Sequence, residues 1–133
     1  MLDRLTDSLN FQTQALVLRS ERQRVIASNI ANADTPGYQA REMDFAAALR
    51  AASGSGRSAS ALSATQAGHL SAGGTAGGTA LTYAAPAQTN LDSNTVDMDR
   101  ERAAFADNAV HYEATLRFIN GSVRTMLSAI TGQ

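Results

Sequence analysis

Two histidines are the first candidates for chemistry in this sequence. His111 lies four residues after Asp107, the spacing of an exposed pair on one helix face, whereas His69 stands alone and is assigned a local hydrogen bond. A protein metal site needs several ligands close together, and neither histidine has a second one at ligand spacing. We therefore predict no metal ion and no cofactor.

Three acids, Asp97, Asp99 and Glu101, stand close enough together to suggest paired catalytic carboxylates. They also open a long segment of helical periodicity, where negative charge stabilises the positive end of the helix dipole. Helix-start electrostatics explains them without a further assumption. The chain contains no Cys and no Lys, which excludes disulfides, thiol nucleophiles, Walker-type phosphate loops and Schiff-base chemistry. We predict that the protein is not an enzyme.

The composition indicates a chain that cannot build a generous core alone. Its 133 residues carry 11 basic and 12 acidic side chains, a balance that argues against a general nucleic-acid binder. Of the 58 hydrophobic residues 26 are Ala, and only 25 are Leu, Ile, Val or Phe. The apolar run at 15–18 is too short for a membrane span or a cleaved signal peptide. We expect no direct membrane insertion and a core completed by neighbouring subunits.

The first 34 residues predict one long helix. Leu2, Leu5, Leu9, Leu16, Ile26 and Ile30 fall near one helical stripe, and a second stripe runs beside it. No Gly or Pro occurs before Pro36. Pro36 disfavours helical geometry at Thr35, and Gly37 suits the positive φ of a tight turn, so the helix should stop there.

The middle of the chain predicts irregular structure. Residues 35–50 form a turn and motif segment, and 51–94 form a loop-rich middle with a short extended piece at 81–83. Of the 40 residues from 51 to 90, 30 are Ala, Gly, Ser or Thr. Such a stretch buries too little area to offset its ordering entropy, so we expect it to order against neighbours.

Residues 95–131 predict a second long helix with a sharper pattern. Its predicted seam alternates in steps of four and three, as in coiled coils: Met98, Arg102, Phe105, Ala109, Tyr112, Leu116, Ile119, Val123, Met126 and Ile130. Glu113 and Arg117 can pair one turn apart. The fold class is therefore mainly α. One domain of 1–133 has its terminal helices paired as a coiled coil and joined by an Ala/Gly/Ser-rich middle segment.

Two motifs then carry a resemblance to a known family. Residues 28–41, SNIANADTPGYQAR, resemble the N-terminal signature of flagellar axial rod and hook proteins, and EMDF at 42–45 is similar to the version in proximal rod proteins. Residues 92–101, 105–109 and Tyr112 are similar to the start of that family's C-terminal helix, and TQAGHL at 65–70 to a middle element. The resemblance assigns assembly residues: Asn29, Asn32, Thr35, Pro36, Gly37, Tyr38, Asn94, Val96 and Asp97.

The resemblance implies a structural subunit of the bacterial flagellar basal body. Such proteins polymerise helically into the periplasmic rod that carries torque for motility, with their terminal helices in the axial core. The implied partners are other copies of the chain, the adjacent rod protein FlgC, the basal-body adaptor FliE and the flagellar type III export apparatus. Export then proceeds without a cleaved signal, and Phe45 with Leu49 matches the spacing of the family's export-gate signal.

Alternatives remain at this point. The chain resembles another short proximal rod protein of the FlgC kind less closely, and a generic coiled-coil adaptor would share its seams. For Asn29 and Asn32 two interpretations stand side by side: capping of the first helix before Pro36, or buried amides that fix helix register. The seam residues Phe105, Tyr112, Leu116, Ile119, Val123 and Met126 are interpreted as packing residues, not as a cofactor site.

Overall fold

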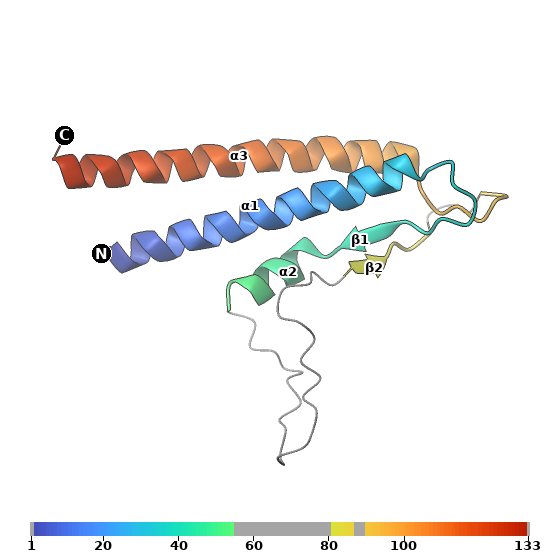
Figure 1. Cartoon of the computed structure of the whole chain (residues 1–133), viewed down its shortest axis with the longest axis horizontal. Coiled ribbons are helices and arrows are strands. Elements are labelled where there is room, and N and C mark those ends of the chain that lie inside the picture. The colour runs from blue at the N-terminus through green and yellow to red at the C-terminus, as the bar shows by residue number, and fades with distance from the viewer. Residues whose placement is uncertain (1, 55–80, 87–89, 133) are drawn as a thin grey trace, which may run out of the picture.

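A computed structural model describes residues 2–54, 81–86 and 90–132 of the chain. The elements follow in the order α1 (Leu2–Ala31), β1 (Arg41–Met43), α2 (Phe45–Ala52), β2 (Leu81–Tyr83) and α3 (Met98–Thr131). The two long helices lie side by side, with both chain ends at the same end of the pair (Figure 1). The mainly helical fold with paired terminal helices is therefore confirmed. None of the described helices is both long and apolar enough to cross a bilayer.

A short arm of the chain lies on the α1 side of this pair (Figure 1). It consists of α2 and the antiparallel ribbon of β1 with β2, in which Glu42 faces Thr82. The ribbon contains the extended piece expected at 81–83. The helix α2 was not predicted, although Asp44 caps it with a side-chain acceptor for the Ala47 N–H at 3.0 Å. Most of the expected loop-rich middle and His69 lie outside the described residues.

The interior of the described part is small and unusually polar. Its buried hydrophobic residues are Ala15, Leu18, Ile26, Ala40, Met43 and Val96. The largest fully buried side chains are three asparagines: Asn29, Asn94 and Asn108. A buried amide is costly unless its hydrogen bonds are made, so these three side chains must be held by specific partners.

The contact line along α3 differs from the predicted seam. The least exposed positions there include Glu101, Ala104, Asn108, Tyr112, Thr115, Ile119, Ser122 and Met126. Three predicted seam residues, Tyr112, Ile119 and Met126, belong to this line. Phe105, Leu116 and Val123 instead lie beside it and are 41, 37 and 41% exposed. The reason is the amide of Asn108, which bonds to the α1 backbone and so turns a line of small and polar residues towards α1.

Candidate assembly site

Asn94 joins the start of the C-terminal segment to the end of α1. Its Nδ2 donates to the carbonyl oxygens of Asn32, Ala33 and Thr35 at 3.0, 2.8 and 2.8 Å. Its Oδ1 accepts from the Val96 N–H at 2.8 Å. These three carbonyls belong to the turn directly after α1, which ends at Ala31, and a residue about 60 positions later in the sequence supplies their donor. Asn94 thus anchors the start of the C-terminal segment to the turn that follows α1.

Asn29 joins α1 to the arm and to α3. Its amide pairs with the edge of β1, since Nδ2 donates to the Arg41 carbonyl at 2.8 Å and Oδ1 accepts from the Arg41 N–H at 3.0 Å. Nδ2 also donates to Glu101 Oε1 at 3.0 Å, and the Tyr38 hydroxyl donates to Oδ1 at 3.3 Å. Of the two interpretations offered for this residue, the structure places Asn29 in long-range contacts.

Asn32 and Thr35 belong to the turn that follows α1. Asn32 Nδ2 donates to the Ser28 carbonyl at 2.8 Å, and Thr35 Oγ1 donates to Asn32 Oδ1 at 3.3 Å. These contacts are local, as the capping interpretation expects. Pro36 is exposed in the same turn, and Gly37 has a φ of +72°, the left-handed conformation that its residue type allows without strain.

Residues 92–97 lie alongside the turn that follows α1 and are hydrogen-bonded to residues 37 and 38. The Gly37 N–H donates to the Asp92 carbonyl at 2.8 Å, and the Thr95 N–H donates to the Tyr38 carbonyl at 3.1 Å. Val96 is buried beneath the segment. Asp97 then starts α3 as its N-cap, accepting from two backbone N–H groups. The two motifs that the sequence singled out therefore form one connected structure.

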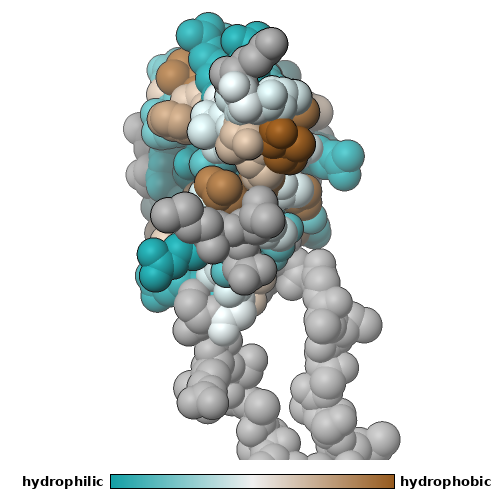
Figure 2. Space-filling view, turned by 90° about the vertical axis from the view of Figure 1, so that its left-hand side faces the viewer, coloured by the Kyte–Doolittle hydropathy of each residue, from teal (hydrophilic) through white to brown (hydrophobic). Residues whose placement is uncertain are grey.

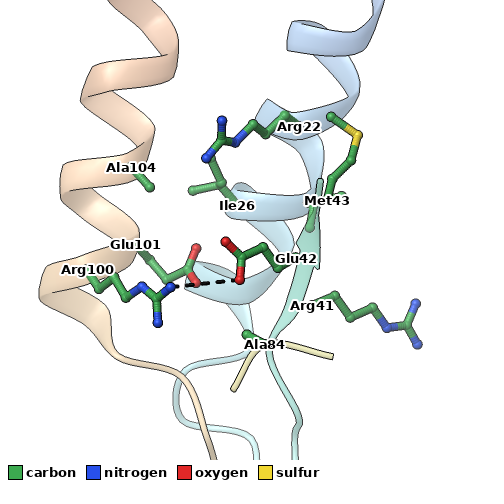
Figure 3. A pocket seen from close by; sticks show the side chains of 10 residues that line it. Arg22, Ile26, Arg41, Glu42, Met43, Ala84, Arg100, Glu101 and Ala104 are labelled. Atoms are coloured by element: carbon green, nitrogen blue, oxygen red, sulfur yellow. Dashed lines mark ion pairs between the residues drawn. The ribbon is translucent and has the colours of Figure 1, made fainter. Parts of the chain in front are cut away.

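The sequence analysis explained Glu101 only by electrostatics at a helix start. In the structure, Glu101 also lines a pocket of about 40 Å³ between α1, β1 and α3. The Glu101 and Glu42 carboxylates face this space, and Arg100 Nη2 lies 3.8 Å from Glu42 Oε2 (Figure 3). Burial raises the pKa of Glu101, and the nearby Glu42 and Asp97 add to the rise. The Asn29 hydrogen bond and Arg100 oppose it. No group of three or more potential ligands that could hold a metal ion occurs within the part of the chain that the structure describes.

This raised pKa predicts a pH-dependent stability. A folded state that raises the pKa of a carboxyl group binds the proton more tightly than the unfolded chain does. Its stabilising contribution is therefore complete below the unfolded pKa near 4.5 and is lost as pH rises through the folded pKa. Glu101→Gln should flatten this part of the profile, so that the free energy of unfolding gained between pH 7 and pH ~4.5 is smaller than in the parent chain.

The matched control for this experiment is Glu113→Gln. Glu113 is exposed, and among the described residues it pairs with Arg117, so the variant should keep the parent profile. Urea unfolding followed by circular dichroism at a series of pH values measures all three chains. Parallel profiles for the parent and Glu101→Gln would contradict the role assigned to burial of Glu101.

Asn108 is the buried amide that the sequence analysis did not select. Its Nδ2 donates to the Arg19 carbonyl at 2.9 Å and to Gln23 Oε1 at 2.6 Å. Its Oδ1 has no hydrogen-bond partner among the described residues. A polar residue in a helix seam costs stability but specifies one register, because other registers leave it unpaired. The signal was present in the sequence, since Gln23 and Arg19 interrupt the apolar stripe of α1 opposite it.

The export-signal residues Phe45 and Leu49 are both half-buried on α2, which packs on α1. The Arg19 guanidinium carbon lies 4.4 Å from the centre of the Phe45 ring, a cation–π contact. Burial lowers the pKa of Arg19, with the charge of Arg22 acting in the same direction. The predicted pairs His111–Asp107, at 3.4 Å, and Arg117–Glu113, at 2.6 Å, are confirmed as exposed contacts on α3.

Comparisons with known proteins agree with the motif geometry. The family of flagella basal body rod proteins matches residues 9–39, which cover most of α1 and the turn after it. The flagellar basal body rod protein FlgB of Escherichia coli K12 is 48% identical over 134 residues, covering 98% of this chain and 97% of that protein. FlgB of Salmonella typhimurium is 46% identical, with 99% of both chains covered. FlgB of Cereibacter sphaeroides is 42% identical, with 96% of both covered. The chain belongs to the FlgB family of flagellar basal body rod proteins.

Proposed function

We propose that this rod protein polymerises helically with copies of itself and transmits torque from the membrane ring to the distal rod and hook. The observation that carries the proposal is the placement of the large apolar residues of α3. Phe105, Leu116 and Val123 lie beside the contact line with α1 and are 37–41% exposed, while Ala104, Thr115 and Ser122 lie on that line. Complete burial of a large apolar side chain is worth about 1.5–3 kcal/mol, and an isolated chain forgoes the part that belongs to the surface still exposed.

Hydrophobic side chains also reach the surface at the end where both termini lie (Figure 2). Leu127 and Ile130, in the last turns of α3, are 55 and 74% exposed. Large apolar side chains gathered at one end of the molecule favour a contact with a neighbour there. A subunit that gains its remaining core from neighbours fits the low content of large apolar residues in the sequence.

Deletion of the gene from its own organism tests this function. We expect the deleted strain to lose swimming and to yield basal bodies without a rod, and a plasmid copy of the parent chain should restore both. Rods of normal length in the deleted strain would contradict the proposal. The proposed neighbours FlgC and FliE would be sought by cross-linking in isolated basal bodies, where a cross-link to neither would refute those two assignments.

The export role of Phe45 and Leu49 gives a separate prediction. Both side chains are partly covered in the folded chain, so an export gate that reads them must meet the chain before α2 packs on α1. Leu49→Ala should therefore lower the amount of exported protein several-fold. Its matched control is Leu81→Ala, an equal truncation of an exposed leucine in β2.

Export is measured as the fraction of the chain found outside the cytoplasm, with total expression held equal. Phe45→Ala should behave like Leu49→Ala. Its loss of the Arg19 contact should cost only about 0.5–1 kcal/mol of stability, so misfolding would not account for a large export defect. Unchanged export of both variants would remove the two residues from the signal.

A further inference from the structure

The exposed apolar residues of α3 form two separate surfaces. The first, the α3 stripe, consists of Phe105, Ala109, Leu116, Val123, Leu127 and Ile130. The second, the α3 knob, consists of Val110 and Phe118, which are 68 and 66% exposed. At about 100° per residue, Phe118 lies about 160° around the helix from Leu116 and about 140° from Val123. The two surfaces therefore face nearly opposite directions.

The α3 stripe continues the interface that α3 already makes with α1. Tyr112, Ile119 and Met126 belong to the same heptad pattern and are half-buried along the α1 contact line. Five of the stripe's six residues, all but Leu127, belong to that pattern too, and the stripe spans about 38 Å from Phe105 to Ile130 at 1.5 Å per residue. A narrow apolar surface of this length fits another helix packed alongside, as in coiled coils, rather than a compact ligand.

The α3 knob lies beside a glycine that the chain itself does not need. Gly121, three residues after Phe118, stands in the interior of α3 with helical φ, and a Cβ added there would meet nothing within 4 Å. Glycine in a helix interior is unfavourable relative to alanine. Together with Ala114 and Ser122, it surrounds Phe118 on α3 with small residues only, so a neighbouring helix can approach closely there.

We propose that the α3 knob of one copy of this chain packs against the α3 stripe of the next copy. A two-fold contact uses the same patch on both subunits and closes as a dimer, whereas a head-to-tail contact uses two different patches and can repeat without end. Two apolar surfaces on opposite sides of one helix provide the second arrangement. The inference rests on the proposed helical assembly and names the surfaces that perform it.

Introduced cysteines test the contact directly, because the chain contains none of its own. Phe118→Cys and Val123→Cys combined in one chain should give, on oxidation of cells carrying assembled rods, a ladder of disulfide-linked multimers. Each single variant should stay uncross-linked, because like surfaces do not meet. The control pairs Phe118→Cys with Asn10→Cys, an exposed polar position on α1, and should give no ladder.

The outcomes separate this contact from the function on which it rests. Swimming of the unoxidised double variant shows that the rod forms. A swimming strain without a ladder, or Val123→Cys dimers formed alone, overturns the contact and leaves the rod function standing. If the double variant does not swim, Phe118→Cys and Val123→Cys expressed together in one cell decide. Cross-linked dimers support the contact, and their absence overturns it.

Gly121→Leu provides a second test with opposite effects on fold and assembly. The substitution replaces a poor helix former with a good one in open space, so the purified chain should melt at a higher temperature than the parent. It also places a large side chain beside Phe118, where a neighbouring helix should approach, and swimming should be lost. Asn10→Leu, at the exposed position on α1 used above, is the control and should keep swimming. A stabilised Gly121→Leu chain that swims normally overturns the role of close approach at Gly121.

Discussion

Asn94→Asp is expected to destabilise the folded chain by about 3 kcal/mol or more, although the change replaces one amide NH₂ with an oxygen. The carboxylate keeps the acceptor for Val96 but loses the donor to three carbonyl oxygens at 2.8–3.0 Å. It also places negative charge at the negative end of the α1 dipole. A domain of ordinary stability has only about 5–15 kcal/mol in total, so the loss is large.

Urea unfolding followed by circular dichroism measures this effect. Asn90→Asp, an exposed change of the same kind four residues earlier, is the control and should stay within about 0.5 kcal/mol of the parent. The loss in Asn94→Asp should shrink below about pH 4, where the carboxyl group protonates and offers one donor again. Equal stability of the two variants at neutral pH would refute the role of Asn94 as the donor that holds the turn after α1.

Asn29→Asp is the second change with a large expected effect. It removes the Nδ2 donor from the Arg41 carbonyl and sets a second carboxylate against Glu101, which already lies close to Glu42. We expect a loss of about 2–3 kcal/mol at neutral pH, because a buried acceptor is left unpaired and like charges meet. Asn29→Leu should retain the helices yet impair rod assembly, because β1 loses its anchor on α1.

The pairing of Asn29 with Glu101 can be isolated by a double-mutant cycle. Adding Glu101→Gln to Asn29→Asp reverses the roles of donor and acceptor, so an amide again faces a carboxylate. The double variant should recover at least about 1 kcal/mol relative to the sum of the single changes. The same second change at exposed Glu113 should recover nothing. A strictly additive double variant would show that the two side chains do not interact.

Much of the fold could be predicted from local patterns in the sequence. The apolar periodicity on either side of Pro36 predicted two long helices, and Gly37 has the positive φ expected of its turn. Residue types alone also predicted the two ion pairs on α3. α3 begins at Met98, three residues after the predicted start, because Asp97 is its cap. Each of these features depends on residues within one or two turns.

The features that periodicity missed depend on partners far apart in the chain. The motif residues Asn29 and Asn94 were selected by resemblance, but their acceptors at Arg41, Ala33 and Thr35 follow only from the folded path. For Asn108 the interruptions of the α1 stripe at Arg19 and Gln23 were a signal, but its bond to the Arg19 backbone carbonyl, 89 positions earlier, leaves no trace in a side-chain pattern. The apolar periodicity predicted for α3 is present in the helix. However, Phe105, Leu116 and Val123 lie beside the contact line with α1 rather than on it.

Hydrogen bonds in a polar interior and large apolar residues at the surface together favour a subunit that assembles with neighbours. The three buried asparagines hydrogen-bond α1 and its turn to segments far along the chain with little apolar area, while many large apolar side chains of α3 stay partly or mostly exposed. A long helical pair of this kind can pass force along its axis through many small contacts. A single chain therefore leaves large apolar side chains uncovered, in agreement with the small core that its alanine-rich composition indicates.

An electron cryo-microscopy map of the basal body from the source organism tests the central claim most directly. The account predicts the α1–α3 pair of this chain in the rod, with Phe105, Leu116 and Val123 covered by a helix of the next copy that presents Phe118. A rod that lacks this chain would contradict the function. A rod in which the same three side chains face solvent would contradict the assembly.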